Sequence, residues 1–273
     1  GGALAMAPDV LRRVIEPPPP ARGFRQYSLS QLAERKMRQL GASATTGAPF
    51  NEFAQSAIVR EADERRRLYY AVPFVSANPT TALAYQYPPP GVAPSASLAP
   101  PTARTVLARL SAGAAPGTSG GPTVVIARSG AFVFGGFASD GWRADGVPFG
   151  GPRCFLFSLT LDLKIPFQGR RTDPDDAALA AAQQRADEQP PDAASSAREV
   201  LDCLRASEQG GLCFGARDLV LLAGGETAAG GANCSSSLEW SYSIGLRPDS
   251  HEAACLLAGQ PTFALDALEV WRV

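Results

Sequence analysis

Histidine is nearly absent from this sequence, and that scarcity limits the chemistry open to the chain. The single histidine, His251, lies in a polar stretch beside Asp249 and Glu252. A Ser–His–Asp hydrolase needs a histidine that a third group holds next to the nucleophile. A lone histidine in a polar loop is more often solvated than catalytic, so we expect His251 to have no role in catalysis.

Metal-binding and phosphate-binding motifs are also missing. The cysteines form no C-x-x-C pair, and no cluster of histidine and cysteine has zinc spacing. The glycine-rich stretch 224–231 lacks the Gly-Lys-Ser/Thr ending of a P-loop, and the acidic residues 173–176 lack the pattern of a calcium loop. Glu239 and Glu269 lie near predicted strands, where hydrogen bonding explains them better than a catalytic pair does. The sequence therefore predicts no catalytic residue, no cofactor and no metal.

Charge and long apolar runs are scarce. The 25 basic residues nearly balance the 26 acidic ones, and the net charge of −1 gives no electrostatic reason to bind nucleic acid or an anionic membrane. No apolar run approaches the ~18 residues that cross a bilayer, so we expect no membrane insertion. The five cysteines are odd in number, which fits reduced thiols in an intracellular, cytoplasmic setting better than a disulfide framework.

Apolar stretches separated by glycine and proline clusters make up most of what is present. Hydrophobic residues form 45% of the chain, which is enough for a real core. The length of 273 residues fits one large domain with an appendage. We expect an N-terminal arm at 1–79 and a domain at 80–273, with insertions at about 169–198 and 241–261.

The arm contains three predicted helices, at 8–16, 28–40 and about 51–67. Four consecutive prolines end the first, and Ser28 with Gln31 has the spacing of a capping box at the start of the second. The apolar faces of the second and third helices carry the candidate partner contacts Leu29, Leu32, Met37, Leu40, Phe53 and Ile58. These faces either pack on the domain that follows, which is the simpler interpretation, or clamp a partner protein.

The domain shows strand periodicity from Thr123 onwards. Apolar residues alternate or run together between glycine-rich turns, which favours an antiparallel sandwich. The predicted strands are 123–127, 131–137, 154–163, 219–223 and 265–271. A short helix is expected at 102–110, and residues 196–204 fit either a capped helix or a strand. The fold class is mainly β with α (α+β): a two-sheet antiparallel β-sandwich with short flanking helices, plus the N-terminal helical and extended arm.

A series of motifs runs through this domain. One strand carries Phe134-Gly135, an aromatic-glycine step precedes Phe155-Leu156-Phe157, and the last strand carries Leu268-Glu269-Val270-Trp271. The residues of this signature are Phe134, Gly135, Trp142, Gly150, Phe155, Phe157, Glu269 and Trp271. Their order resembles the TLDc domain of oxidation-resistance proteins and their relatives, over about residues 80–273.

Strand geometry predicts where these side chains lie. Because neighbouring side chains of a strand point to opposite faces, Phe155 and Phe157 share one face, and Leu156 lies on the other. We expect Phe134, Phe155, Phe157 and Trp271 to be buried together in one sandwich core.

Two segments depart from the family pattern. Gly151-Pro152-Arg153 stands where the family usually has Thr-Gly-Glu, and Ser237-Leu238-Glu239 stands where it usually has Thr-Phe-Asn. If the missing glutamate contributes to oxidative protection in the family, that role does not carry over to this chain.

The resemblance implies a function in binding rather than in catalysis. Several relatives bind the vacuolar-type proton ATPase and protect against oxidative stress, and the family has no established active site. The first hypothesis is therefore a non-catalytic interaction protein whose partners are ATPase subunits, placed in the cytoplasm at an organelle membrane complex. The alternative is a structural subunit of another large complex, ciliary or cytoskeletal, that docks through this domain.

Overall fold

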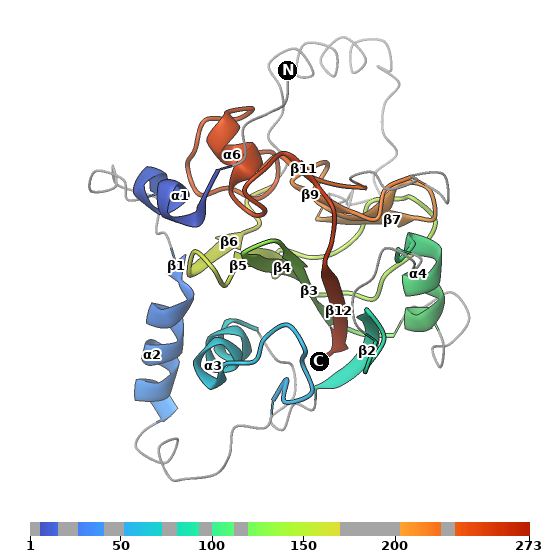
Figure 1. Ribbon diagram of the computed structural model, residues 1–273, viewed down its shortest axis with the longest axis horizontal. Helices are drawn as coiled ribbons and strands as arrows, with labels where there is room; N and C mark the ends of the chain where they lie inside the picture. Colours follow the sequence, from blue (N-terminus) through green and yellow to red (C-terminus); the bar gives the residue numbers. More distant parts are fainter. Residues whose placement is uncertain are drawn as a thin grey trace, which may run out of the picture.

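Two antiparallel β-sheets lie face to face at the centre of the computed structural model (Figure 1). The structure describes residues 6–15, 27–40, 52–72, 81–92, 100–111, 120–169, 203–224 and 233–273. Across these ranges, the larger sheet has seven strands in the order β1 (Tyr27–Ser28), β6 (Leu163–Pro166), β5 (Phe155–Ser158), β4 (Phe132–Ala138), β3 (Thr123–Ser129), β12 (Ala267–Arg272) and β2 (Ala82–Tyr87). The smaller sheet has the order β11 (Thr262–Phe263), β10 (Cys234–Ser236), β9 (Leu219–Leu221), β8 (Gly211–Phe214) and β7 (Leu204–Ser207). The pairs are antiparallel throughout, which confirms the predicted sandwich.

Short helices flank the sheets, as the sequence predicts. The described helices are α1 (Pro8–Ile15), α2 (Leu29–Leu40), α3 (Ala62–Ala71), α4 (Ala103–Ser111) and α6 (His251–Cys255). Ser28 caps α2 as expected, because its hydroxyl accepts the Gln31 N–H at 3.2 Å. Among the described residues, no helix has the length and apolar character needed to cross a membrane.

The predicted helix at about 51–67 is wrong in its first half. Phe53 has a φ of 56°, and the segment around it forms turns, so α3 begins only at Ala62. The cause is tertiary. The main-chain N–H groups of Ala57 and Ile58 donate to the carboxylate of Glu269, so this segment folds around that carboxylate.

The predicted strand at 154–163 is wrong in its second half, because β5 ends at Ser158 and a turn leads to β6, which begins at Leu163. β5 and β6 pair with each other, and the chain reverses through Asp162, whose φ is 57°. The Asp162 carboxylate accepts the Ser30 N–H at 3.0 Å and the Arg67 guanidinium at 3.1 Å. This turn therefore holds the start of α2 and the side of α3 at the same time.

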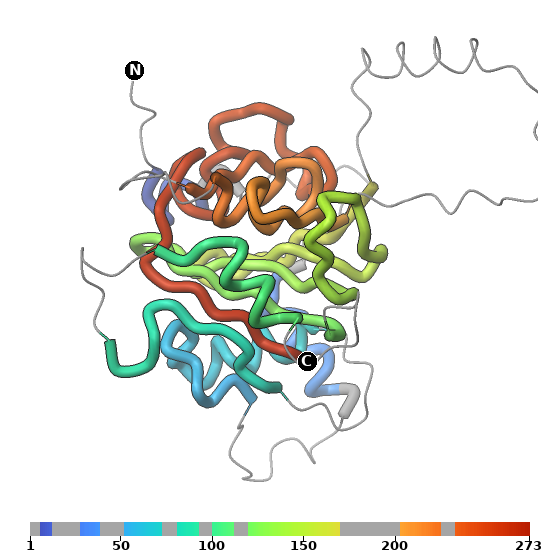
Figure 2. Tube along the Cα trace, turned by 90° about the vertical axis from the view of Figure 1, so that its right-hand side faces the viewer, coloured from blue at the N-terminus to red at the C-terminus, as the bar shows by residue number. Residues whose placement is uncertain are grey.

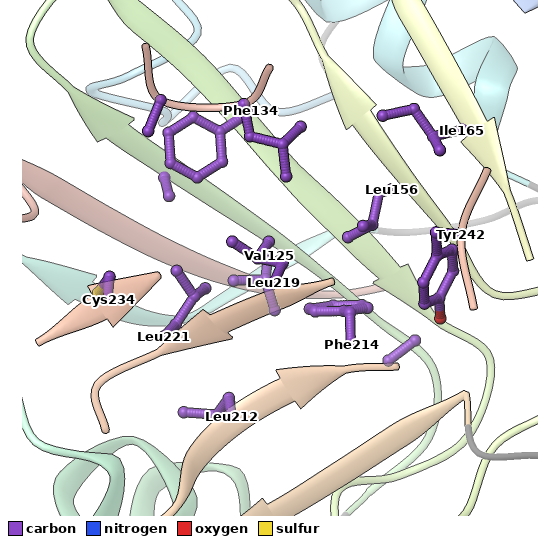
Figure 3. Packing of buried hydrophobic residues seen from close by; sticks show 14 of the residues in the cluster. Val125, Phe134, Leu156, Ile165, Leu212, Phe214, Leu219, Leu221, Cys234 and Tyr242 are labelled. Carbon is purple, nitrogen blue, oxygen red and sulfur yellow. The ribbon is translucent and has the colours of Figure 1, made fainter. Parts of the chain in front are cut away.

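The space between the two sheets is filled by apolar side chains. Phe134 and Leu156 reach into it from the larger sheet, and Phe214 and Leu221 reach into it from the smaller one (Figure 3). Leu156 thus lies on the inner face of β5, as the alternation predicts. Tyr242 closes one end, and its hydroxyl donates to the Cys203 carbonyl at 2.8 Å.

The outer face of the larger sheet is equally apolar, and the arm covers it. Figure 2 shows three layers, with α2 and α3 below, the larger sheet in the middle and the smaller sheet above. Phe155, Phe157 and Trp271 pack against arm residues on this outer face, whereas Phe134 lies between the sheets. All four are buried as expected, but the expectation of one shared core is wrong.

The helix α1 lies apart from the rest of the arm. It packs beside α6 at the small-sheet end of the sandwich (Figure 1), where the Met6 N–H donates to the Gly259 carbonyl. Leu11 is buried in the inter-sheet core. The N-terminal segments therefore contact both sides of the larger sheet, and β1 adds a strand to its edge beside β6.

Residues 241–261, which the sequence predicts as a loop insertion, are part of the core. Tyr242, Leu256 and Leu257 are fully buried, and α6 lies in this segment. The predicted insertion at about 169–198 lies, except for Gly169, outside the described residues.

Candidate functional site

Glu269 of β12 is a densely hydrogen-bonded acidic group on the arm side of the larger sheet. Its side chain faces the arm and is fully buried. One carboxylate oxygen accepts the N–H groups of Ala57 at 2.6 Å and Ile58 at 3.2 Å. The other accepts the Ser56 hydroxyl at 2.6 Å and the Trp271 indole N–H at 3.0 Å. Burying a carboxylate is costly unless donors surround it, and four donors do so here.

The turn that supplies these donors is organised by its own side chains. The Ser56 hydroxyl accepts the Val59 N–H at 2.8 Å, which tightens the turn. Phe53 meets the Trp271 ring edge-on, with ring centroids 5.2 Å apart. The turn at 52–59 and the end of β12 thus form one polar contact with an aromatic contact beside it.

A cavity of about 260 Å³ opens next to this contact. The turn of the arm supplies Ile58 and Arg60, and the loop after β2 supplies prolines and Val92. Arg128, near the end of β3 and paired with Ala267 of β12, completes the lining. The cavity therefore lies at the junction between the arm and the larger sheet.

Two other buried carboxylates hold loops in place. Burial raises the pKa of Asp218 to about 6, although hydrogen bonds from the main chain of Ser241, Tyr242 and Trp240 act to lower it. Glu239, at a φ of 83°, accepts the Ile244 N–H at 2.9 Å and the Ser243 hydroxyl. Both groups thereby fix the segment that carries Tyr242 into the core.

The five cysteines are buried. A hydrogen bond with Cys203, together with weaker effects from Ser139 and Gly151, lowers the pKa of Cys154 to about 6 despite its burial. Burial raises the pKa of Cys234 to about 12. The acidity of these thiols is thus set by their local surroundings.

His251 is the first residue of α6 rather than part of a loop, and it is exposed. Its ring lies 3.5 Å from the Cys255 sulfur, one helical turn away. Within the described ranges, no group of three histidine, cysteine or acidic side chains is placed to hold a metal ion.

The predicted arm contacts divide into two sets. Leu29, Phe53 and Ile58 are buried against the outer face of the larger sheet, so the chain itself covers them in this conformation. Leu32 and Met37 of α2 are half-buried, and the side chain of Leu40 lies outside the described residues. This packing is what the simpler interpretation predicts, and binding of a partner by the arm stays a prediction.

The signature residues serve as framework. A Cβ atom at Gly135 would lie 1.9 Å from the Val125 carbonyl oxygen, so only glycine fits there. Gly150 has a φ of 101°, and the Trp142 indole donates to Thr123 at 2.8 Å. The aromatic members Phe134, Phe155, Phe157 and Trp271 fill the two cores.

Sequence reasoning missed the residues that meet at the junction. Ser56, Arg60 and Arg128 come from a turn and a strand far apart in the chain, and no local motif marks them. The sequence predicts hydrogen bonding for Glu269 but not the turn that supplies its donors. The apolar residues of this turn have helical spacing, so the local sequence predicts a helix there.

A two-sheet sandwich with this framework defines a protein built on the TLDc fold. The family model of the TLDc domain matches residues 117–273, more than half of the chain, and the chain belongs to this family. The match confirms the resemblance read from the motifs. No curated protein matches the chain.

Proposed function

We propose that this protein is a non-catalytic interaction module that binds and regulates a large assembly, with the vacuolar-type proton ATPase as the leading candidate. Membership of the TLDc family supports binding to other proteins at the family level. The ATPase is the partner that the resemblance to oxidation-resistance proteins implies, together with a role under oxidative stress. On this proposal the protein works in the cytoplasm, at a complex on an organelle membrane.

The observation that carries the proposal is the role of the signature residues, which all serve the fold. The aromatic members of the signature form the two cores, and its one acidic member, Glu269, is occupied by four donors from within the chain. Asp218 and Glu239 are likewise engaged by neighbouring main-chain groups. These carboxylates hold the structure together, which supports a function in presenting a surface rather than in transferring protons.

Affinity purification of the intact tagged chain, followed by mass spectrometry of the captured proteins, tests the proposal. We expect reproducible enrichment of proton-ATPase subunits over a control domain of similar size with the same tag. Recovery of axonemal or cytoskeletal proteins instead would replace the ATPase with the structural alternative. Absence of any reproducible partner would contradict the interaction function itself.

A purified system separates binding from regulation. Adding the intact chain to purified proton ATPase should change its rate of ATP hydrolysis or its state of assembly. If the chain binds the ATPase but changes neither property, it is an interaction module without a regulatory role.

A further inference from the structure

The cavity beside Glu269 joins two parts of the chain that are distant in sequence. Arg60 comes from the turn of the arm, and Arg128 comes from β3 of the matched TLDc region. The start of β12 also lines the cavity, through Ala267 and Glu269. Any molecule held here would contact the arm and the sheet together.

The charges in this cavity are unbalanced. The Nε–H of Arg60 donates to the Ala57 carbonyl at 3.0 Å, which leaves its terminal amino groups available. Within the ranges that the structure describes, no carboxylate lies within ion-pairing distance of Arg60 or Arg128. The nearby Asp266 carboxylate accepts the Gly130 N–H at 2.6 Å instead of pairing with Arg128.

The one lining carboxylate, Glu269, can offset only one of these two positive charges. Both oxygens of Glu269 already accept two hydrogen bonds each from the arm turn and Trp271. Two guanidinium groups thus share a recess whose one acidic lining residue is saturated. A guanidinium group presents donors in a planar fork that matches a carboxylate, which makes an acidic group the natural ligand.

Apart from Gln86 and Tyr87, the other side chains that line the cavity are apolar. Ile58, Pro88 and Pro89 line it, and Val92 at its rim is 44% exposed. Its volume of about 260 Å³ lies below the roughly 300–1,000 Å³ of sites for small molecules and cofactors. A recess of this size and lining suits one acidic side chain, with its aliphatic stem against the prolines and its carboxylate between the arginines.

We infer that the Arg60–Arg128 cavity binds a glutamate or aspartate side chain of a partner protein. This inference rests on the proposed interaction function and names the chemistry that the partner supplies. Because the two arginines come from the arm and from the sheet, the bound side chain links them. Partner binding then holds the arm in place on the outer face of the larger sheet.

A blocked peptide with one central acidic residue tests the site directly. Acetyl-Ala-Leu-Glu-Leu-Ala-amide is titrated into the intact chain while the arginine Nε–H signals are followed by NMR. We expect the Arg60 and Arg128 signals to shift and saturate, and binding to weaken at least tenfold when glutamine replaces the central glutamate. Equal binding of the two peptides, or shifts at other arginines instead, would overturn the inference.

Free N-acetylglutamate in a parallel titration shows whether the flanking peptide adds affinity. Binding of the free acid as tight as that of the peptide would point to a small metabolite and overturn the assignment to a protein partner.

Matched variants separate this inference from the proposed function. Arg128→Gln and Arg60→Gln should each weaken peptide binding about tenfold, whereas Arg153→Gln, which removes an exposed arginine elsewhere, should not. Unchanged melting temperatures would show that the fold is intact. If the wild type captures its assembly and the Arg60→Gln/Arg128→Gln double variant captures it equally well, the cavity inference fails and the interaction function stands. If the wild type captures nothing while the peptide binds as expected, the interaction function fails and the acidic-group site stands.

Discussion

Replacing Glu269 with glutamine tests the contact between arm and sheet with the smallest change of shape. The oxygen that remains can still accept the N–H groups of Ala57 and Ile58. The new amide group then faces the Trp271 indole N–H, which is itself a donor and so loses its acceptor. A buried donor left without an acceptor costs about 1–3 kcal/mol. We expect the free energy of unfolding to fall by that amount.

Urea denaturation measures the change, and hydrogen exchange shows where it acts. The amides of Ala57 and Ile58 should exchange faster in the Glu269→Gln variant, while those of the inter-sheet core stay protected. Glu208→Gln is the control, because Glu208 forms an exposed ion pair with Arg104, and such a pair contributes about 0–1 kcal/mol. If Glu269→Gln and Glu208→Gln have equal effects on stability and exchange, the account of the carboxylate contact is refuted.

Three further predictions concern the buried ring of Trp271, the buried carboxylate of Asp218 and the exposed side chain of His251. Trp271→Ala should lower the free energy of unfolding in urea by about 3–5 kcal/mol, since this buried ring contacts Phe53 and donates to Glu269; a loss below about 1 kcal/mol would contradict the packing. Because the pKa of Asp218 is raised to about 6 in the folded state but is about 3.9 when unfolded, the folded state binds more protons between these values. Its contribution to stability is therefore present below pH ~4 and is lost as the pH rises through about 6; Asp218→Asn should remove this part of the pH dependence, and an unchanged pH profile would count against it. His251→Ala should leave partner capture and any ATPase regulation unchanged, because the residue is exposed; loss of function with intact folding and binding would point to catalysis.

The alternation of side chains along β5 correctly predicts which residues share a face of the larger sheet. Leu156 lies inside the sandwich, and Phe155 and Phe157 lie outside it. Alternation identifies a face but does not identify what covers it. Both faces of this sheet are apolar, so the sequence does not show that the aromatic residues belong to two cores. The position of the arm, which covers the outer face, separates them.

The spacing of apolar residues predicts the wrong local structure where a group distant in sequence binds the backbone. Residues 51–67 have helical apolar spacing, but Glu269, more than 200 positions away, binds the N–H groups of Ala57 and Ile58. Similarly, the chain turns at Asp162 just before β6, and the carboxylate of this residue binds Ser30 and Arg67. Arg60 and Arg128 meet only through this folding, so no sequence motif could have placed them in one cavity.

The central claim is that the arm forms one folded unit with the TLDc domain. The most direct test compares the thermal melting of the intact chain with that of residues 80–273 alone. Deletion of the arm would expose the outer face that carries Phe155, Phe157 and Trp271. We predict a lower melting temperature and increased binding of a hydrophobic dye by the truncated chain. An unchanged melting temperature and no added dye binding would contradict the claim and favour an arm that serves only to hold a partner.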